Sequence, residues 1–261
     1  MTIGLVILTS LNVIACWEAT AHTFNNKFFI LVNSENFVRK QMIKLYDLSG
    51  KNDLRFSPPC WTVKLCLLHK KINFETVPVR FSEKDKIAFS GQTLVPILEH
   101  EGGFVYDSWE IIKWLDENYL ENKLFINGTS KNFSYFLYNW TSRQLLPVLF
   151  KIIAHEIPNV LEGEDINYYI RTREDRIKGP ITKFKQNISE FTNEFNKLIN
   201  PIRKIIDANG FVAGKEPGVE DYLFFGNFKW VSCCSSSILL ETKDPIYQWF
   251  KDLSELADKV K

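Results

Sequence analysis

A Ser-Pro-Pro helix start lies between two strand-like segments of the sequence, and this order narrows the possible folds. Residues 43–46 alternate apolar and polar side chains, which predicts a half-buried strand. Ser57 before Pro58 predicts the start of a helix, because serine caps unpaired N–H groups and proline at the first helical position has no N–H to satisfy. Residues 74–79 read as a second strand. Since a helix separates the two strands, we expect them to pair in parallel.

A hairpin and a second helix follow. Apolar segments at residues 94–99 and 104–106 flank a Gly-Gly turn, which favours an antiparallel pair. Asp107 then starts a helix that ends near Tyr119. Strand, helix, strand, hairpin and helix is the element order of a thioredoxin-like domain. We therefore expect an α/β thioredoxin-like domain at residues 42–122.

The second half of the chain carries helical periodicity alone. Over residues 184–205 apolar side chains recur every three or four positions, which predicts one long helix with a kink at Pro201. Further helices are expected at residues 219–233 and 245–256. The prediction for residues 129–261 is an all-α helical-bundle domain. A length of 261 residues agrees with two domains of roughly 100–200 residues each.

Residues 1–41 precede this pattern as an N-terminal extension. We expect the extension to be disordered or spurious, with Met42 as an alternative natural start. Its apolar run, residues 3–16, is too short to span a bilayer. The alternative is a signal peptide over residues 1–21, which would make the protein secreted.

The charge balance and the spacing of the Cys and His residues argue against nucleic acid, a membrane surface and a metal ion as partners. Lys plus Arg number 32 and Asp plus Glu 31, for a net charge of +1, which gives no electrostatic reason to expect nucleic acid or a membrane surface as partner. The five cysteines and four histidines form no CxxC pair and have no zinc-ligand spacing, so we expect no metal. A reduced cysteine complement indicates a cytoplasmic protein.

Four groups of residues, in this order, carry a family resemblance: Phe56–Trp61 with Lys64, Thr93–Leu98, Tyr106–Tyr119, and Phe211–Pro217 running into Asp221–Gly226 and Trp230. With these groups the sequence resembles the cytosolic glutathione transferases, most closely the fungal FuA-type and bacterial β-etherase-like branch. The match covers Met42 to about Lys251. It implies the glutathione transferase architecture and glutathione as co-substrate, with no metal. It also implies a hydrophobic electrophile as second substrate, a detoxification role and a homodimer.

The resemblance assigns the catalytic role to Ser57. A free thiol has a pKa of about 8.5, and lowering it by two units takes about 2.7 kcal/mol. A hydroxyl hydrogen bond to the thiolate supplies about 1.5–3 kcal/mol and a helix N-terminus another ~0.3–1 kcal/mol, so Ser57 can account for the shift. From the residue alone, Ser57 can also be a simple helix cap. Cys60, three residues further, is the redox alternative, although its residue type favours a small, partly buried hydrophobe.

The remaining glutathione contacts are also carried over from the family. A cis peptide bond at Val95-Pro96 would turn the N–H and C=O of Val95 toward the backbone of glutathione, like an added strand, although the dipeptide alone favours trans. Asp107 and Ser108 would receive the γ-glutamyl end, and they also suit a helix cap. Candidates for the glycine carboxylate are unranked: Lys84, Lys86 and Gln92.

Two further observations concern the helical half. The aromatic residues of 133–140, with Phe228 and Trp230, are candidates for the border of the electrophile site. Gly218 stands where the family usually has a Ser or Thr cap, three residues before Asp221; glycine costs only a few tenths of a kcal/mol there, so we expect the fold to survive.

The leading interpretation is thus a glutathione transferase that conjugates glutathione to hydrophobic electrophiles, with aryl-ether cleavage as a variant. Two alternatives stay open: a non-catalytic carrier or regulator with this fold, and a thiol–disulfide enzyme that uses Cys60.

Overall fold

The computed structural model describes residues 42–125, 128–236 and 239–260. The expectations for residues 1–41, the disordered or spurious extension and the signal peptide alike, lie outside the described residues.

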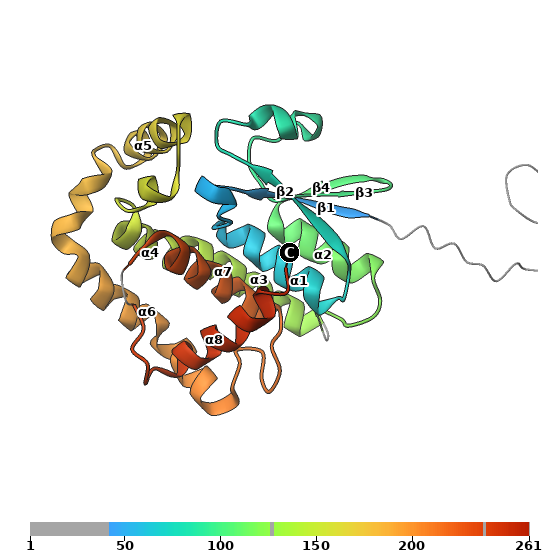
Figure 1. Cartoon of the computed structure of the whole chain (residues 1–261). Helices are drawn as coiled ribbons and strands as arrows, with labels where there is room; N and C mark the ends of the chain where they lie inside the picture. The colour runs from blue at the N-terminus through green and yellow to red at the C-terminus, as the bar shows by residue number, and fades with distance from the viewer. Residues whose placement is uncertain (1–41, 126–127, 237–238, 261) are drawn as a thin grey trace, which may run out of the picture. The chain divides into compact units, whose positions relative to one another are not determined.

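The N-terminal half is built on one four-stranded sheet with the strand order β2-β1-β3-β4 (Figure 1). As the sequence predicts, β1 pairs in parallel with β2 and the hairpin strands β3 and β4 are antiparallel. Strand β3 also pairs antiparallel with β1. The elements of this half are β1 (Ile43–Leu48), α1 (Pro58–His69), β2 (Phe74–Val79), β3 (Ile97–His100), β4 (Gly103–Tyr106) and α2 (Ser108–Asn118).

The described residues beyond β4 are helical or irregular, with no further strand. The helices are α3 (Gly128–Trp140), α4 (Leu146–Ile153), α5 (Glu164–Ile177), α6 (Ile188–Asn209), α7 (Val219–Cys234) and α8 (Pro245–Ala257). A π-helical turn, Thr141–Leu145, joins α3 to α4. Short 3-10 turns lie at Lys51–Asp53, Lys84–Ser90, Ile157–Val160 and Ile181–Asn187. The predicted fold class, an α/β thioredoxin-like part followed by an all-α part, is confirmed.

Two predicted boundaries were wrong. The long helix α6 begins at Ile188, because Phe184 belongs to a separate 3-10 turn, and it continues through Pro201 to Asn209. The third strand begins at Ile97 and not at residue 94, since Pro96 has no N–H for the strand ladder.

Helix α1 is the structural centre of the described residues. Every residue from Cys60 to Leu67 is buried, because α1 packs against both α2 and α7. The approach of α7 depends on Gly226: a Cβ at this position would lie 2.3 Å from the carbonyl oxygen of Pro58. Glycine at this contact therefore sets the distance between α7 and the first turn of α1.

Candidate active site

Two adjoining cavities lie at the N-terminus of α1. The larger has a volume of ≈ 550 Å³ and the smaller one of ≈ 420 Å³. Both are walled by the start of α1, the loop before β3 and the α3–α4 junction, through Pro58, Pro59, Leu94, Val95, Ser142 and Leu146. A molecule in one cavity can therefore contact a molecule in the other.

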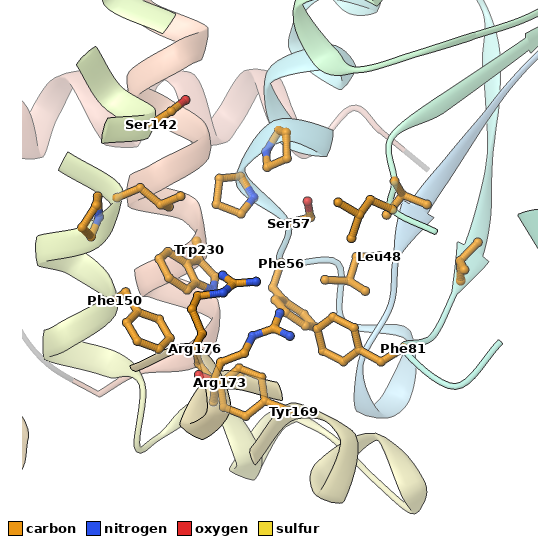
Figure 2. A pocket seen from close by; sticks show the side chains of 18 of the residues that line it. Leu48, Phe56, Ser57, Phe81, Ser142, Phe150, Tyr169, Arg173, Arg176 and Trp230 are labelled. Carbon is orange, nitrogen blue, oxygen red and sulfur yellow. The ribbon is translucent and has the colours of Figure 1, made fainter. Parts of the chain in front are cut away.

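Ser57 lies on the wall of the larger cavity, immediately before the two prolines that both cavities share (Figure 2). Its backbone is extended, as the residue before a proline prefers, and its side chain is 5% exposed. The hydroxyl makes no capping hydrogen bond to α1. The simple cap, which the sequence left open, is thus not the role that this side chain takes.

Cys60 is placed differently. The side chain is fully buried and lines neither cavity. Burial, followed by the nearby Asp47 carboxylate, raises the pKa of the Cys60 thiol well above its ordinary value, and this outweighs the opposing effects of Ser57 and Lys64. A thiol in this environment has little thiolate character.

A buried ionic cluster supports the loop that carries Ser57. The Nζ atom of Lys64 lies 2.8 Å from Oδ2 of Asp47, and both side chains are almost completely buried. Arg55 also contacts Oδ2 of Asp47, at 3.3 Å, and its backbone carbonyl accepts the indole N–H of Trp61 at 2.8 Å. These contacts attach the chain before Ser57 to β1 and α1.

Val95 and Pro96 lie at the junction of the cavities. The peptide bond between them is cis, as the resemblance implied. Val95 lines both cavities and Pro96 lines the smaller one. Among the described residues, none bonds the backbone N–H or C=O of Val95.

Asp107 and Ser108 line the smaller cavity at the N-terminus of α2. Asp107 caps this helix: its Oδ1 accepts the N–H groups of Trp109 at 2.8 Å and Glu110 at 3.3 Å. Its φ of 66° lies in the left-handed region, a conformation that concentrates at functional sites. The cap leaves Oδ2 facing the hydroxyl of Tyr138, which donates to it at 3.2 Å.

Tyr138 is a site residue whose position the sequence did not reveal. It extends from α3 into the smaller cavity, whereas the aromatic segment 133–140 was expected to border the electrophile. Burial, followed by the Asp107 carboxylate, raises the pKa of Tyr138 to about 12. The hydroxyl therefore keeps its proton throughout the physiological pH range. Of the other residues considered for that border, Trp230 lines the larger cavity, and Phe228 is a core residue that lines neither.

Lys84, Lys86 and Gln92, the three candidates for the glycine carboxylate of glutathione, lie in different places. Gln92 lines the smaller cavity. Lys84 lines the larger cavity, and its ammonium group donates to the carbonyl of Thr93. Lys86 lines neither cavity and pairs with Glu83 at 2.8 Å.

Comparison with known proteins identifies the family. Residues 53–123 match the family model described as glutathione S-transferase, N-terminal domain, and residues 132–249 match the one described as glutathione S-transferase, C-terminal domain.

The chain belongs to the glutathione S-transferase family.

The fold is shared with solved fungal and plant structures. A glutathione S-transferase of Ceriporiopsis subvermispora, crystallised with glutathione, has a TM-score of 0.72 at 18% identity, over 83% of this chain and 96% of that one. Glutathione transferase GSTFuA3 of Phanerochaete chrysosporium has a TM-score of 0.72 at 18% identity, over 82% and 96%. Glutathione transferase F2 of Populus trichocarpa has a TM-score of 0.61 at 16% identity, over 84% and 96%.

This glutathione transferase has a larger cavity that sequence reasoning largely missed. Its wall combines aromatic and basic side chains from elements far apart in the chain, among them Phe56, Phe81, Phe150, Tyr169, Arg173 and Arg176 (Figure 2). No motif groups these residues, so their convergence depends on how the helices pack. Among the described residues, no group of His, Cys, Asp or Glu side chains is arranged to hold a metal ion. No described helix is both long and apolar enough to cross a membrane.

Proposed function

We propose that this glutathione transferase binds glutathione in the smaller cavity and uses the Ser57 hydroxyl to stabilise its thiolate, which attacks a hydrophobic electrophile in the larger cavity. The observation that carries the proposal is the place of Ser57: a buried hydroxyl on the wall of one cavity, beside the prolines shared with the other, and not used to cap its helix.

The groups of the smaller cavity match a zwitterionic peptide. The Asp107 carboxylate suits the ammonium of the γ-glutamyl group, while Ser108 and the N-terminus of α2 suit its carboxylate. The backbone N–H and C=O of Val95 suit the cysteinyl backbone. Gln92, which lines this cavity, is our preferred ligand for the glycine carboxylate.

Ser57 has the energetic capacity to activate the thiol. A charge-assisted hydrogen bond contributes about 1.5–3 kcal/mol, and a helix N-terminus contributes ~0.3–1 kcal/mol. The sum matches the ~2.7 kcal/mol that a two-unit decrease in thiol pKa requires. Cys60 lacks this capacity, because its buried thiol faces neither cavity and has a raised pKa.

The larger cavity suits the electrophile, because most of its lining is apolar or aromatic. Conjugation displaces a leaving group from carbon, and the thiol proton passes to solvent. An aryl ether fits the same scheme: the thiolate forms a C–S bond, the C–O bond breaks, and the phenolate leaves and takes up a proton. We propose conjugation as the main activity and ether cleavage as its variant.

Three assays test this function together. We expect retention on immobilised glutathione, conjugation of chlorodinitrobenzene, and near-complete loss of conjugation in Ser57→Ala with retention unchanged. Activity that survives in Ser57→Ala but disappears in Cys60→Ser, with hydroxyethyl-disulfide reduction, would establish the thiol–disulfide alternative. Retention without either activity would establish a carrier, and no retention would contradict the proposed function altogether.

We also propose that the enzyme is a homodimer. Exposed aromatic side chains gather near β4 and on α3, at Phe89, Phe104, Tyr106, Phe133, Tyr135 and Phe136. Such groups are typical of interaction surfaces. Light scattering should give twice the mass of the chain, and Phe136→Glu should reduce it; a monomer at all concentrations would contradict the proposal.

A cytoplasmic location is the last part of the proposal. Cys60, Cys66, Cys233 and Cys234 are all free, as is usual where thiols stay reduced. Amino-terminal sequencing of the natural protein tests it, since a mature chain that begins at His22 would establish secretion instead.

A further inference from the structure

Two arginines of α5 extend into the larger cavity. Arg173 and Arg176 are three residues apart and therefore lie on the same face of the helix. Figure 2 shows both guanidinium groups directed from α5 into the cavity, on the side of Phe56 and Ser57. The larger cavity is thus apolar in its body and cationic on one wall.

The charges of this wall are unbalanced. The lining residues include basic side chains from several elements and no Asp or Glu. Arg80 pairs with Glu162, and Lys151 pairs with Glu194 at 3.5 Å. By contrast, neither Arg173 nor Arg176 forms an ion pair with any carboxylate of the described residues.

The contacts of Arg173 are those of a cation without a counter-ion. It donates to the hydroxyl of Thr172 at 2.8 Å, and its guanidinium carbon lies 5.1 Å and 5.0 Å from the ring centroids of Phe81 and Tyr169. Ring faces attract a cation but leave its outward N–H groups available. Arg173 is half-buried, so these N–H groups point into a partly desolvated space.

Neighbouring cations act on one another across this wall. Burial lowers the pKa of Arg173, and Arg176 lowers it further. Burial and Arg173 together lower the pKa of Lys84, which also lines the cavity. Arginine stays protonated in proteins, so the repulsion persists at neutral pH, and an anion between these groups would relieve it.

We propose that the larger cavity selects electrophiles that carry a carboxylate or a similar anionic group on an aromatic body, and that Arg173 and Arg176 bind this group. The inference rests on the proposed function, because it assigns the substrate class of the same site. Both arginines line the larger cavity and not the smaller one, so their role is separate from glutathione binding.

A matched pair of substrates tests the inference. 4-Chloro-3,5-dinitrobenzoate and its neutral carboxamide share one ring and one reaction: the glutathione thiolate adds to the carbon that bears chlorine, chloride leaves, and the thiol proton goes to solvent. Rates are divided by those of the uncatalysed reactions, which removes the difference in intrinsic reactivity. We expect the enzyme to prefer the carboxylate.

The arginine variants should remove this preference. In Arg173→Gln we expect kcat/KM for the carboxylate to fall about ten-fold, mainly through KM, and that for the carboxamide to change less than about two-fold. Arg176 is exposed, so Arg176→Gln should cost only about three-fold for the carboxylate, because solvent screens its charge. Arg173→Lys should restore part of the preference. Arg171→Gln, on the same helix but outside the cavity, is the control and should change neither substrate.

Calorimetry with the two S-aryl glutathione conjugates separates the inference from the proposed function, since binding needs no turnover. Tighter binding of the carboxylate conjugate, lost in Arg173→Gln, would support the anion site even in an inactive protein. Equal binding of both conjugates by the unmodified enzyme, or an equal loss for both in Arg173→Gln, would overturn it. Failure to bind glutathione would contradict the proposed function. The anion site would still be tested by comparing the affinities of the two conjugates.

Discussion

The two cavities differ in how the chain builds them. The smaller cavity takes its predicted glutathione contacts, such as Val95, Asp107 and Ser108, from short motifs at the ends of strands and helices. The larger cavity collects side chains from Leu48 to Trp230, across most of the described chain. The predicted contacts to glutathione are thus encoded locally, whereas the proposed site for the second substrate depends on helix packing. Ser57 lies where the two meet.

Replacement of Ser57 should affect both cavities most strongly. Ser57→Ala should lower kcat for conjugation at pH 7 about 25-fold, because a rise of the thiol pKa from about 6.5 to about 8.5 lowers the thiolate fraction from roughly 76% to roughly 3%. Steady-state kinetics measures this, and Ser57→Thr, which keeps a hydroxyl, should retain part of the rate. A loss confined to the KM of one substrate would instead assign Ser57 to a single cavity.

Gly226→Ala should displace the start of α1, which lines both cavities. The added Cβ would lie 2.3 Å from the backbone oxygen of Pro58, so α1 or α7 must move. We expect the free energy of unfolding to fall by about 1–3 kcal/mol, as overpacking usually costs, and KM to rise for both substrates. Gly128→Ala is the control for urea denaturation, since a Cβ there has no neighbour within 4 Å. Unchanged stability in Gly226→Ala would show that the contact is not rigid.

Phe150→Ala should weaken binding in the larger cavity and leave the smaller cavity unchanged. Phe150 lines only the larger cavity, and its ring packs at 6.2 Å against Phe184. We expect KM for the electrophile to rise about ten-fold, since the lost apolar contact is worth ~1–3 kcal/mol, with KM for glutathione unchanged. Tyr247→Ala, which removes an exposed ring outside both cavities and outside the proposed dimer surface, is the matched control.

Tyr138→Phe should have the opposite selectivity. It removes the hydroxyl that donates to Asp107 at 3.2 Å in the smaller cavity. A net hydrogen bond of about 1 kcal/mol predicts a rise of about five-fold in KM for glutathione alone. Because the pKa of Tyr138 is raised to about 12, the effect should be the same at every pH up to about 9. An effect that disappears within this range would show that the tyrosine titrates.

The half-buried His69, which lies outside both cavities, should give the smallest effect. Burial lowers the pKa of His69, whose Nδ1 lies 2.9 Å from the hydroxyl of Tyr222. The folded protein therefore disfavours the charged ring, and stability should decrease as the pH falls below about 6.5, the unfolded value. Thermal unfolding at several pH values measures this. His69→Gln should reduce the pH dependence of stability without altering either KM. If the pH dependence stays the same in this variant, groups other than His69 cause it.

The same difference between the cavities explains what the sequence could reveal. The strand and helix order, the helix start at Ser57 and the cap at Asp107 follow from local backbone chemistry, so residue types at short spacing predicted them. The cis bond at Val95-Pro96 required the family resemblance. Tyr138 and Arg173 approach their cavities only through contacts between distant helices, which one sequence does not specify.

Gly218 is a residue that the sequence marked as unusual and that only the structure explains. The sequence marked it as a departure from a Ser or Thr cap, and the structure gives a physical reason: a Cβ there would lie 2.8 Å from that of Ala213. Asp221 still completes its half of the motif, accepting the N–H of Gly218 at 3.0 Å and those of Val212 and Ala213 at 2.8 and 3.0 Å.

The central claim is that the Ser57 hydroxyl stabilises the glutathione thiolate. The most direct measurement is the pKa of the bound glutathione thiol, from its ultraviolet thiolate absorbance as a function of pH, in the unmodified enzyme, Ser57→Ala and Cys60→Ser. We predict a thiol pKa about two units below 8.5 in the unmodified enzyme and in Cys60→Ser, and a return toward about 8.5 in Ser57→Ala with similar glutathione affinity. A thiol pKa that is unchanged in Ser57→Ala would contradict the claim.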